Sequence, residues 1–183
     1  LKLLEDSCCY LGIGVESGSD KVLNYIKKSL TVKQAIEFNE KMKNYDITLN
    51  YNFMSGFLNE TEEDLKMTMN LTLKLIKENK NALAGPVNPV QLLPKTELLE
   101  TAVRYGLERP RKLEDWIKFG VSLNNKLNNL PWLDKNRKKL LKKLYFYSLF
   151  LNDQSSYIDS KIIRYILALY RSSIIKKLKF MYN

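Results

Sequence analysis

The chain has 183 residues, of which 45% are hydrophobic and 27% charged, so it can bury a core and intrinsic disorder is excluded. It contains no histidine, and its two cysteines are the neighbours Cys8 and Cys9. This composition excludes a disulfide framework, a histidine-based catalytic site and a zinc site of histidines and spaced cysteines.

The net charge of +10 lies in the last third of the chain. Residues 1–125 carry 17 Lys and Arg against 17 Asp and Glu, whereas residues 126–183 carry 13 against 3. We therefore expect a boundary near residue 125 between a neutral body and a basic tail, and we assign any anionic partner to the tail.

Two features of the sequence bear on where in the cell the protein is located. The apolar runs near residues 162–170 are interrupted by Arg164, and a membrane span needs about 18 uninterrupted apolar residues. No signal peptide is visible at Leu1, and a start without methionine inside a patterned segment predicts a fragment of a longer protein. We expect the protein to be cytoplasmic.

The first predicted elements are a strand and two helices. Residues 9–16 form a short apolar run that is typical of a buried parallel strand. Ser19 or Asp20 is expected to cap the short helix that follows. Thr31 then opens a second helix, because Gln34 completes a capping box.

Residues 47–55 predict the second strand, because apolar and polar side chains alternate along them until Gly56. Alternate residues of a strand point to opposite faces. The alternation places Leu49, Tyr51 and Phe53 on one face and Asn50 and Asn52 on the other.

A long helix should begin at Thr61, which resembles the start of a capping box with acids in the first turn. The carboxylates of Glu60, Glu62, Glu63 and Asp64 are read as complementing the helix dipole rather than as a metal site.

The third strand is predicted at residues 85–93, at a sheet edge because it contains Pro86 and Pro89. A helix is predicted at residues 96–105, with Gly106 just past its end.

Three strands that alternate with helices predict a parallel sheet, in which ligands meet the carboxyl ends of the strands. Three strands cannot close a barrel, so either the sheet is open or further strands precede Leu1. The residues at the predicted strand ends are Glu16, Ser17, Gly18, Ser55, Gly56, Gln91 and Pro94.

The tail is predicted to be helical. Residues 124–129 are polar enough to form a linker, and Leu141 and Leu144 belong to the apolar stripe of a following helix that is rich in lysine. A last helix is expected at about residues 157–182.

Two motifs carry a family resemblance. Residues 11–19, LGIGVESGS, and residues 52–64, NFMSGFLNETEED, make the chain resemble the radical S-adenosylmethionine (SAM) superfamily over about residues 5–105. The resemblance implies an α/β fold, the C-terminal half of a partial TIM-type (β/α)6 barrel at residues 1–125, followed by an all-helical basic tail at residues 126–183.

The resemblance also implies a cofactor site. It places the first motif near the ribose and methionyl part of S-adenosylmethionine and the second motif beside its adenine. The carboxylate of Glu16 suits a ribose diol or an ammonium group, Gly18 would let backbone approach the ligand, and Phe53 and Met54 would form an apolar wall for the base. The implied cofactor-binding residues are Glu16, Ser17, Gly18, Asn52, Met54, Ser55, Gly56 and Gln91.

The chain departs from the family pattern in two respects. Leu58 stands where the family usually has proline, which makes the turn less rigid. The three cysteines, spaced Cys-x-x-x-Cys-x-x-Cys, that would bind a [4Fe-4S] cluster are missing, and the adjacent Cys8 and Cys9 cannot replace them. We therefore assign no catalytic residue and no metal ligand here, and we expect this chain alone to be inactive without the missing N-terminal half of the barrel.

The tail, which includes Leu130-Pro131-Trp132-Leu133, is similar to that of the subgroup with an upstream cobalamin-binding domain. Cobalamin is therefore a further implied cofactor, on a domain outside this chain.

Several alternatives stay open. Glu16 can instead cap a helix or pair with a lysine. The basic tail is first a solvated face, second a peripheral contact for anionic membranes, and only third a nucleic-acid site. The alternative function is a non-catalytic α/β binding module whose basic helices dock on a membrane or an acidic partner.

Overall fold

The computed structural model describes residues 9–119, 122–151 and 169–176. Of the predicted last helix, only residues 169–176 fall within these ranges, and they are helical. Cys8 lies outside them. None of the described helices is both long enough and apolar enough to cross a membrane.

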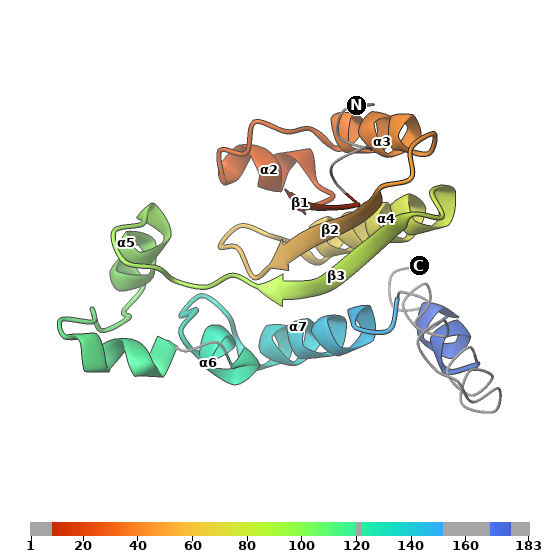
Figure 1. Cartoon of the computed structure of the whole chain (residues 1–183). Coiled ribbons are helices and arrows are strands. Elements are labelled where there is room, and N and C mark those ends of the chain that lie inside the picture. The colour runs from red at the N-terminus through yellow and green to blue at the C-terminus, as the bar shows by residue number, and fades with distance from the viewer. Residues whose placement is uncertain (1–8, 120–121, 152–168, 177–183) are drawn as a thin grey trace.

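The described sheet has three parallel strands in the order β1-β2-β3, which are β1 (Tyr10–Glu16), β2 (Thr48–Ser55) and β3 (Ala82–Pro89) (Figure 1). The predicted parallel sheet and α/β class are confirmed, whereas closure into a partial barrel stays a prediction. β3 begins three residues earlier than predicted, because Ala82 pairs with Leu49 at the start of β2. It ends at Pro89, and beyond that point Val90 donates a single hydrogen bond to the Ser55 carbonyl at 2.8 Å.

The helices begin where the capping signals placed them. Thr31 caps α3 (Val32–Met42) and Thr61 caps α4 (Glu62–Glu78), and both capping boxes are complete. The side chain of Thr96 caps α5 (Glu97–Arg104), and Gly106 follows that helix with a φ of +93°. Ser19 occupies the predicted N-cap position of α2 (Asp20–Tyr25), but its side chain makes no capping hydrogen bond.

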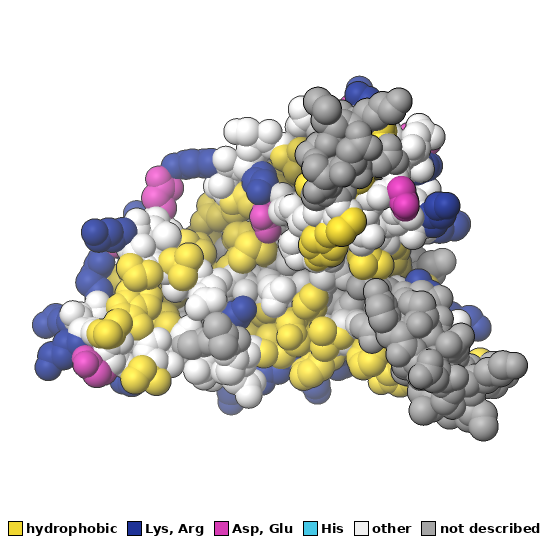
Figure 2. Space-filling model, viewed as in Figure 1, with side chains coloured by type: hydrophobic (Ala, Val, Ile, Leu, Met, Phe, Trp, Pro, Cys, Tyr) yellow, Lys and Arg dark blue, Asp and Glu magenta, His cyan; other side chains and the backbone are white. Residues whose placement is uncertain are grey.

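One face of the sheet is covered and the other is open. Leu49, Tyr51 and Phe53 of β2 are buried, whereas Asn52 between them is exposed, which confirms the predicted alternation. α4 lies behind the sheet in Figure 1. On the face turned to the viewer in Figure 2, the middle is hollowed and mostly hydrophobic or uncharged, and Lys and Arg gather at the margins.

The part of the chain that follows α5 contacts β3 through two of its helices. It contains η1 (Leu113–Phe119), α6 (Leu123–Asn128) and α7 (Lys135–Ser148), and Figure 1 shows α7 running along β3. The backbone N–H of Val87 donates to the Ser148 hydroxyl at 2.8 Å, so α7 satisfies a polar group of the edge strand.

The predicted linker is therefore wrong. Residues 123–128 are helical, because Ser122 caps α6, and Leu127 and Leu130 are fully buried in the same core as β2. The many asparagines of this segment made its buried leucines difficult to recognise from the sequence. We call residues 122–151 the helical extension. It begins shortly before residue 125, where the sequence predicts the boundary between body and tail, and this boundary stays a prediction.

Candidate functional site

The turns after β1 and β2 lie at the same end of the sheet. The strands are parallel, and Glu16 at the end of β1 pairs in register with Phe53 near the end of β2. The two sequence motifs therefore meet at one rim, as a shared ligand site at the carboxyl ends of parallel strands requires.

Glu16 turns its carboxylate back over its own strand. Its φ is +71°, and the register shifts between Gly14 and Glu16. A Cβ added at Gly14 would lie 2.4 Å from Glu16 Oε1, so Gly14 leaves the space that the carboxylate uses. Lys28 donates to the same oxygen at 3.2 Å. The predicted alternative of a lysine partner is thus realised, and part of the carboxylate surface remains accessible, since the side chain is 20% exposed.

Asn52 and Met54 occupy the open face beside this carboxylate. Gly14 pairs with Asn52 across the ladder, and a Cβ added at Gly85 on the other side would lie 2.8 Å from Asn52 Oδ1. Met54 is partly buried two residues further along the same face. Glycines thus flank Asn52 on both neighbouring strands, and the side chains of Glu16 and Asn52 use the space that these glycines leave. We call Glu16, Asn52 and Met54 together the cradle.

Of the two residues predicted to form the apolar wall, Met54 lies on the open face and Phe53 does not. Phe53 is 1% exposed and belongs to the core on the covered face, so it cannot contact a ligand on the face of Met54. The cause is the strand period, which sends neighbouring side chains to opposite faces.

Ser17 and Gly18 turn toward α4 instead of the cradle. The Ser17 hydroxyl lies 3.2 Å from that of Thr68, and the Gly18 N–H donates to the same Thr68 oxygen at 2.9 Å. A Cβ at Gly18 would lie 2.4 Å from the Met67 carbonyl oxygen. Close approach to helix backbone therefore accounts for this glycine, and the predicted cofactor contact of both residues stays a prediction.

Ser55, Gly56 and Gln91 have different surroundings. The Ser55 hydroxyl is buried and has no hydrogen-bond partner among the described residues. Gly56 has a φ of +89°, in the region that favours glycine, and turns the chain out of β2. Gln91 donates from Nε2 to the Phe119 carbonyl at 3.4 Å, so it points toward η1.

Two carboxylates after β2 have shifted pKa values. Burial raises the pKa of Glu60 to about 7, against the opposing effects of the Gly56 N–H and of Arg137. Burial also acts to raise the pKa of Asp64, but hydrogen bonds from Lys21, Ser19 and Thr61 outweigh it and hold this pKa well below its usual range. Asp64 therefore has a structural role in joining α2 to α4.

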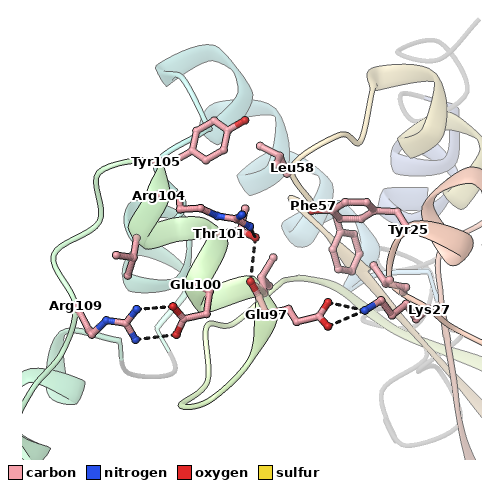
Figure 3. A pocket seen from close by; sticks show the side chains of 13 residues that line it. Tyr25, Lys27, Phe57, Leu58, Glu97, Glu100, Thr101, Arg104, Tyr105 and Arg109 are labelled. Atoms are coloured by element: carbon pink, nitrogen blue, oxygen red, sulfur yellow. Dashed lines mark hydrogen bonds and ion pairs between the residues drawn. The ribbon is translucent and has the colours of Figure 1, made fainter.

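A hollow of about 1100 Å³ lies beside the rim, between the end of α2, the turn after β2 and α5. Figure 3 shows Tyr25 and Phe57 on one side and Arg104 of α5 on the other, where the Arg104 guanidinium donates to the Thr101 hydroxyl of the same helix at 3.1 Å. Lys27 and Glu97 form an ion pair of 2.7 Å between α2 and α5. Arg109 and Glu100, which also line the hollow, form a second ion pair, so most of the charged groups in the lining are already paired.

The described residues do not fit an iron–sulfur cluster. They contain no group of three His, Cys, Asp or Glu side chains that could hold a metal ion, and Cys9, the cysteine among them, is exposed. A cluster needs several converging thiolates, and the whole sequence has two adjacent ones.

Sequence reasoning missed Glu60, Trp132 and Arg137 as parts of the rim. The indole N–H of Trp132 donates to the Gly56 carbonyl at 2.9 Å, and Arg137 donates to the Glu60 carbonyl at 2.8 Å. The sequence contains one indication of this contact, the tryptophan that follows Pro131, but the neighbouring residues do not indicate which turn that tryptophan contacts.

Comparison with known proteins agrees with the motifs. Residues 1–72 match the family model described as the radical SAM superfamily. A tRNA-2-methylthio-N(6)-dimethylallyladenosine synthase of Pelagibacter ubique is 28% identical over 130 residues, which are 68% of this chain and 29% of the relative. A protein of the same name from Aeromonas hydrophila is 39% identical over 74 residues, or 38% of this chain and 14% of the relative.

An uncharacterized methyltransferase of Pyrococcus horikoshii is 27% identical over 142 residues, or 77% of this chain and 29% of the relative. The chain thus spans less than a third of the length of these relatives. The resemblance to the radical SAM superfamily is confirmed, and the similarity is to enzymes.

Proposed function

We propose, from the match of residues 1–72 to the radical SAM superfamily, that this chain supplies the later part of such an enzyme's barrel. In this proposal the cradle on the open face binds the nucleoside portion of S-adenosylmethionine. The bound cofactor, with a [4Fe-4S] cluster held by residues outside this chain, supplies the radical that starts the reaction.

The observation that carries the proposal is the position of the Glu16 carboxylate. It lies over Gly14, on the face and at the height of Asn52, with the Lys28 ammonium group beside it. A carboxylate accepts hydrogen bonds from a ribose diol or from an ammonium group, and the amide of Asn52 can both donate and accept. Lys28 holds the carboxylate in this orientation, which reduces the entropy lost on binding.

The end of β2 adds an apolar surface to the cradle. Met54 offers an apolar surface on the open face, whereas the buried Ser55 shares the covered face with Phe53. These properties support an adenine-sized, flat group at this position, which is the place that the family resemblance assigns to it.

For the reaction of the complete protein we propose only the class of group that is transferred. The names of the relatives include methylthiolation of a tRNA base and methyl transfer, so we propose transfer of a one-carbon or methylthio group after radical formation. Cobalamin stays a prediction that rests on the tail alone. Absorption spectra of the complete enzyme titrated with hydroxocobalamin test it, and spectra identical to those of the free compound would exclude it.

The central test is isothermal titration of the complete, cluster-loaded enzyme with S-adenosylmethionine. Glu16→Ala should weaken binding about tenfold or more, because a hydrogen bond to a charged group contributes about 1.5–3 kcal/mol. Glu37→Ala is the matched control, since Glu37 pairs with Lys33 on the exposed side of α3. Unchanged affinity in Glu16→Ala removes Glu16 from the site, and no binding by the wild-type enzyme favours the non-catalytic binding module.

A further inference from the structure

The helical extension encloses the turn that ends β2. A Cβ added at Gly56 would lie 3.1 Å from a methyl group of Leu130 and 3.3 Å from one of Leu141, with Leu133 at 3.8 Å. Three leucines from the extension therefore surround the one residue of the turn that has a positive φ. The turn and the extension cannot move independently without opening this contact.

Both backbone polar groups of Gly56 are fixed by side chains. Its N–H donates to Glu60 Oε2 at 2.6 Å, and its carbonyl accepts the indole N–H of Trp132 at 2.9 Å. Trp132 lies 76 residues further along the chain. A residue of the extension thus determines the direction of the Gly56 peptide group.

Arg137 closes the same arrangement from α7. Its guanidinium donates to the Glu60 carbonyl at 2.8 Å and lies 3.8 Å from Glu60 Oε2, the oxygen that holds Gly56. The Glu60 side chain is fully buried and that of Arg137 is only 15% exposed. The charged groups around this carboxylate are Arg137 from α7 and Asp64 from α4. Truncation of either partner would leave the other group buried without this partner, so the pair is sensitive to change.

We infer that Trp132 and Arg137 are positioning residues for the cofactor turn, so that the helical extension is part of the cofactor site. The inference rests on the proposed function, because that function places the adenine beside Ser55 and Gly56. A competing explanation is that these contacts only stabilise the fold. In that case their loss would lower stability but leave the affinity of the folded protein unchanged.

The test compares Trp132→Phe with Trp116→Phe in the complete enzyme. Trp132→Phe removes the indole donor and keeps an aromatic ring. Trp116 lies in η1, where its ring packs on that of Phe119 at a centroid distance of 5.1 Å. Titration with S-adenosylmethionine should show binding weakened about three- to tenfold in Trp132→Phe and unchanged in Trp116→Phe. Arg137→Met should weaken binding, and Arg137→Lys should restore part of the loss.

Hydrogen exchange without cofactor provides a second measurement. Exchange at residues 56–58 should accelerate in Trp132→Phe and stay at the wild-type rate in Trp116→Phe. If Trp132→Phe lowers the melting temperature but leaves both the affinity and this exchange unchanged, the inference is wrong. Equal weakening in both tryptophan variants also overturns it. If the wild-type enzyme binds no S-adenosylmethionine, the proposed function fails, and the exchange result still decides whether the extension holds the turn.

Discussion

The substitution Gly18→Ala tests whether this glycine serves helix packing or ligand approach. The added Cβ would lie 2.4 Å from the Met67 carbonyl oxygen and 2.6 Å from both the Met67 carbonyl carbon and the Thr68 Cα. All three atoms belong to the backbone of α4, so no flexible side chain can move aside. The turn must therefore retreat from α4, and the Gly18–Thr68 hydrogen bond of 2.9 Å must lengthen.

The expected cost follows from these two effects. Forcing an extra carbon into a packed site costs about 1–3 kcal/mol, and loss of one hydrogen bond adds about 1 kcal/mol. Gly18→Ala should therefore lower the free energy of unfolding by about 2–4 kcal/mol. Urea unfolding followed by circular dichroism at 222 nm measures this change without any cofactor.

Gly12→Ala is the matched control, because a Cβ added at Gly12 meets nothing within 4 Å. Alanine is favoured over glycine in a strand interior by about 0.5–1 kcal/mol, so this variant should be neutral or slightly more stable. If Gly18→Ala lies within about 0.5 kcal/mol of the wild type, the close contact with α4 does not explain the glycine, since ordinary surface changes stay within that range.

Two further substitutions test the helix start and the buried carboxylate. Thr61→Ala should lower the free energy of unfolding by about 1 kcal/mol, because it removes the cap of α4. Thr31→Ala, at the exposed cap of α3, should lower this free energy by no more than Thr61→Ala does. A larger loss in Thr31→Ala in the same urea assay would contradict the structure. Glu60→Gln should remove a pH dependence of the free energy of unfolding. The pKa of Glu60 is raised from 4.5 to about 7, so the contribution of this carboxyl group to stability is complete below pH 4.5 and is lost as the pH rises through 7. The difference in unfolding free energy between Glu60→Gln and the wild type should therefore grow in favour of the variant by on the order of 3 kcal/mol from pH 4.5 to 8, and a pH-independent difference would show that burial does not raise this pKa.

Local patterns were sufficient to predict the strands and most helix starts. The two capping boxes lie within four consecutive residues each, and the alternation along β2 is visible in eight residues. Such signals depend only on backbone period and on side-chain bonds to nearby N–H groups. They therefore survive without knowledge of the tertiary structure.

The contacts that shape the rim depend on residues far apart in the sequence. The Gly18–Thr68 bond joins residues 50 apart, and the bonds of Trp132 and Arg137 join residues 76 and 77 apart. No local pattern specifies such partners. For the same reason Ser19 was read as a helix cap, although its hydroxyl donates instead to Asp64 at 2.7 Å.

The open face could still have been deduced from β1 and β2 together. Gly12 and Gly14 alternate with Leu11 and Ile13, and they pair in register with Asn50 and Asn52. A face that combines glycines on one strand with asparagines on the next has too little apolar surface to bury a helix. The side chain best placed to use the space is Glu16, which reaches it only because of its positive φ. The cradle thus depends on Gly14, which leaves room above the strand, and on one irregular residue that directs its carboxylate into that room.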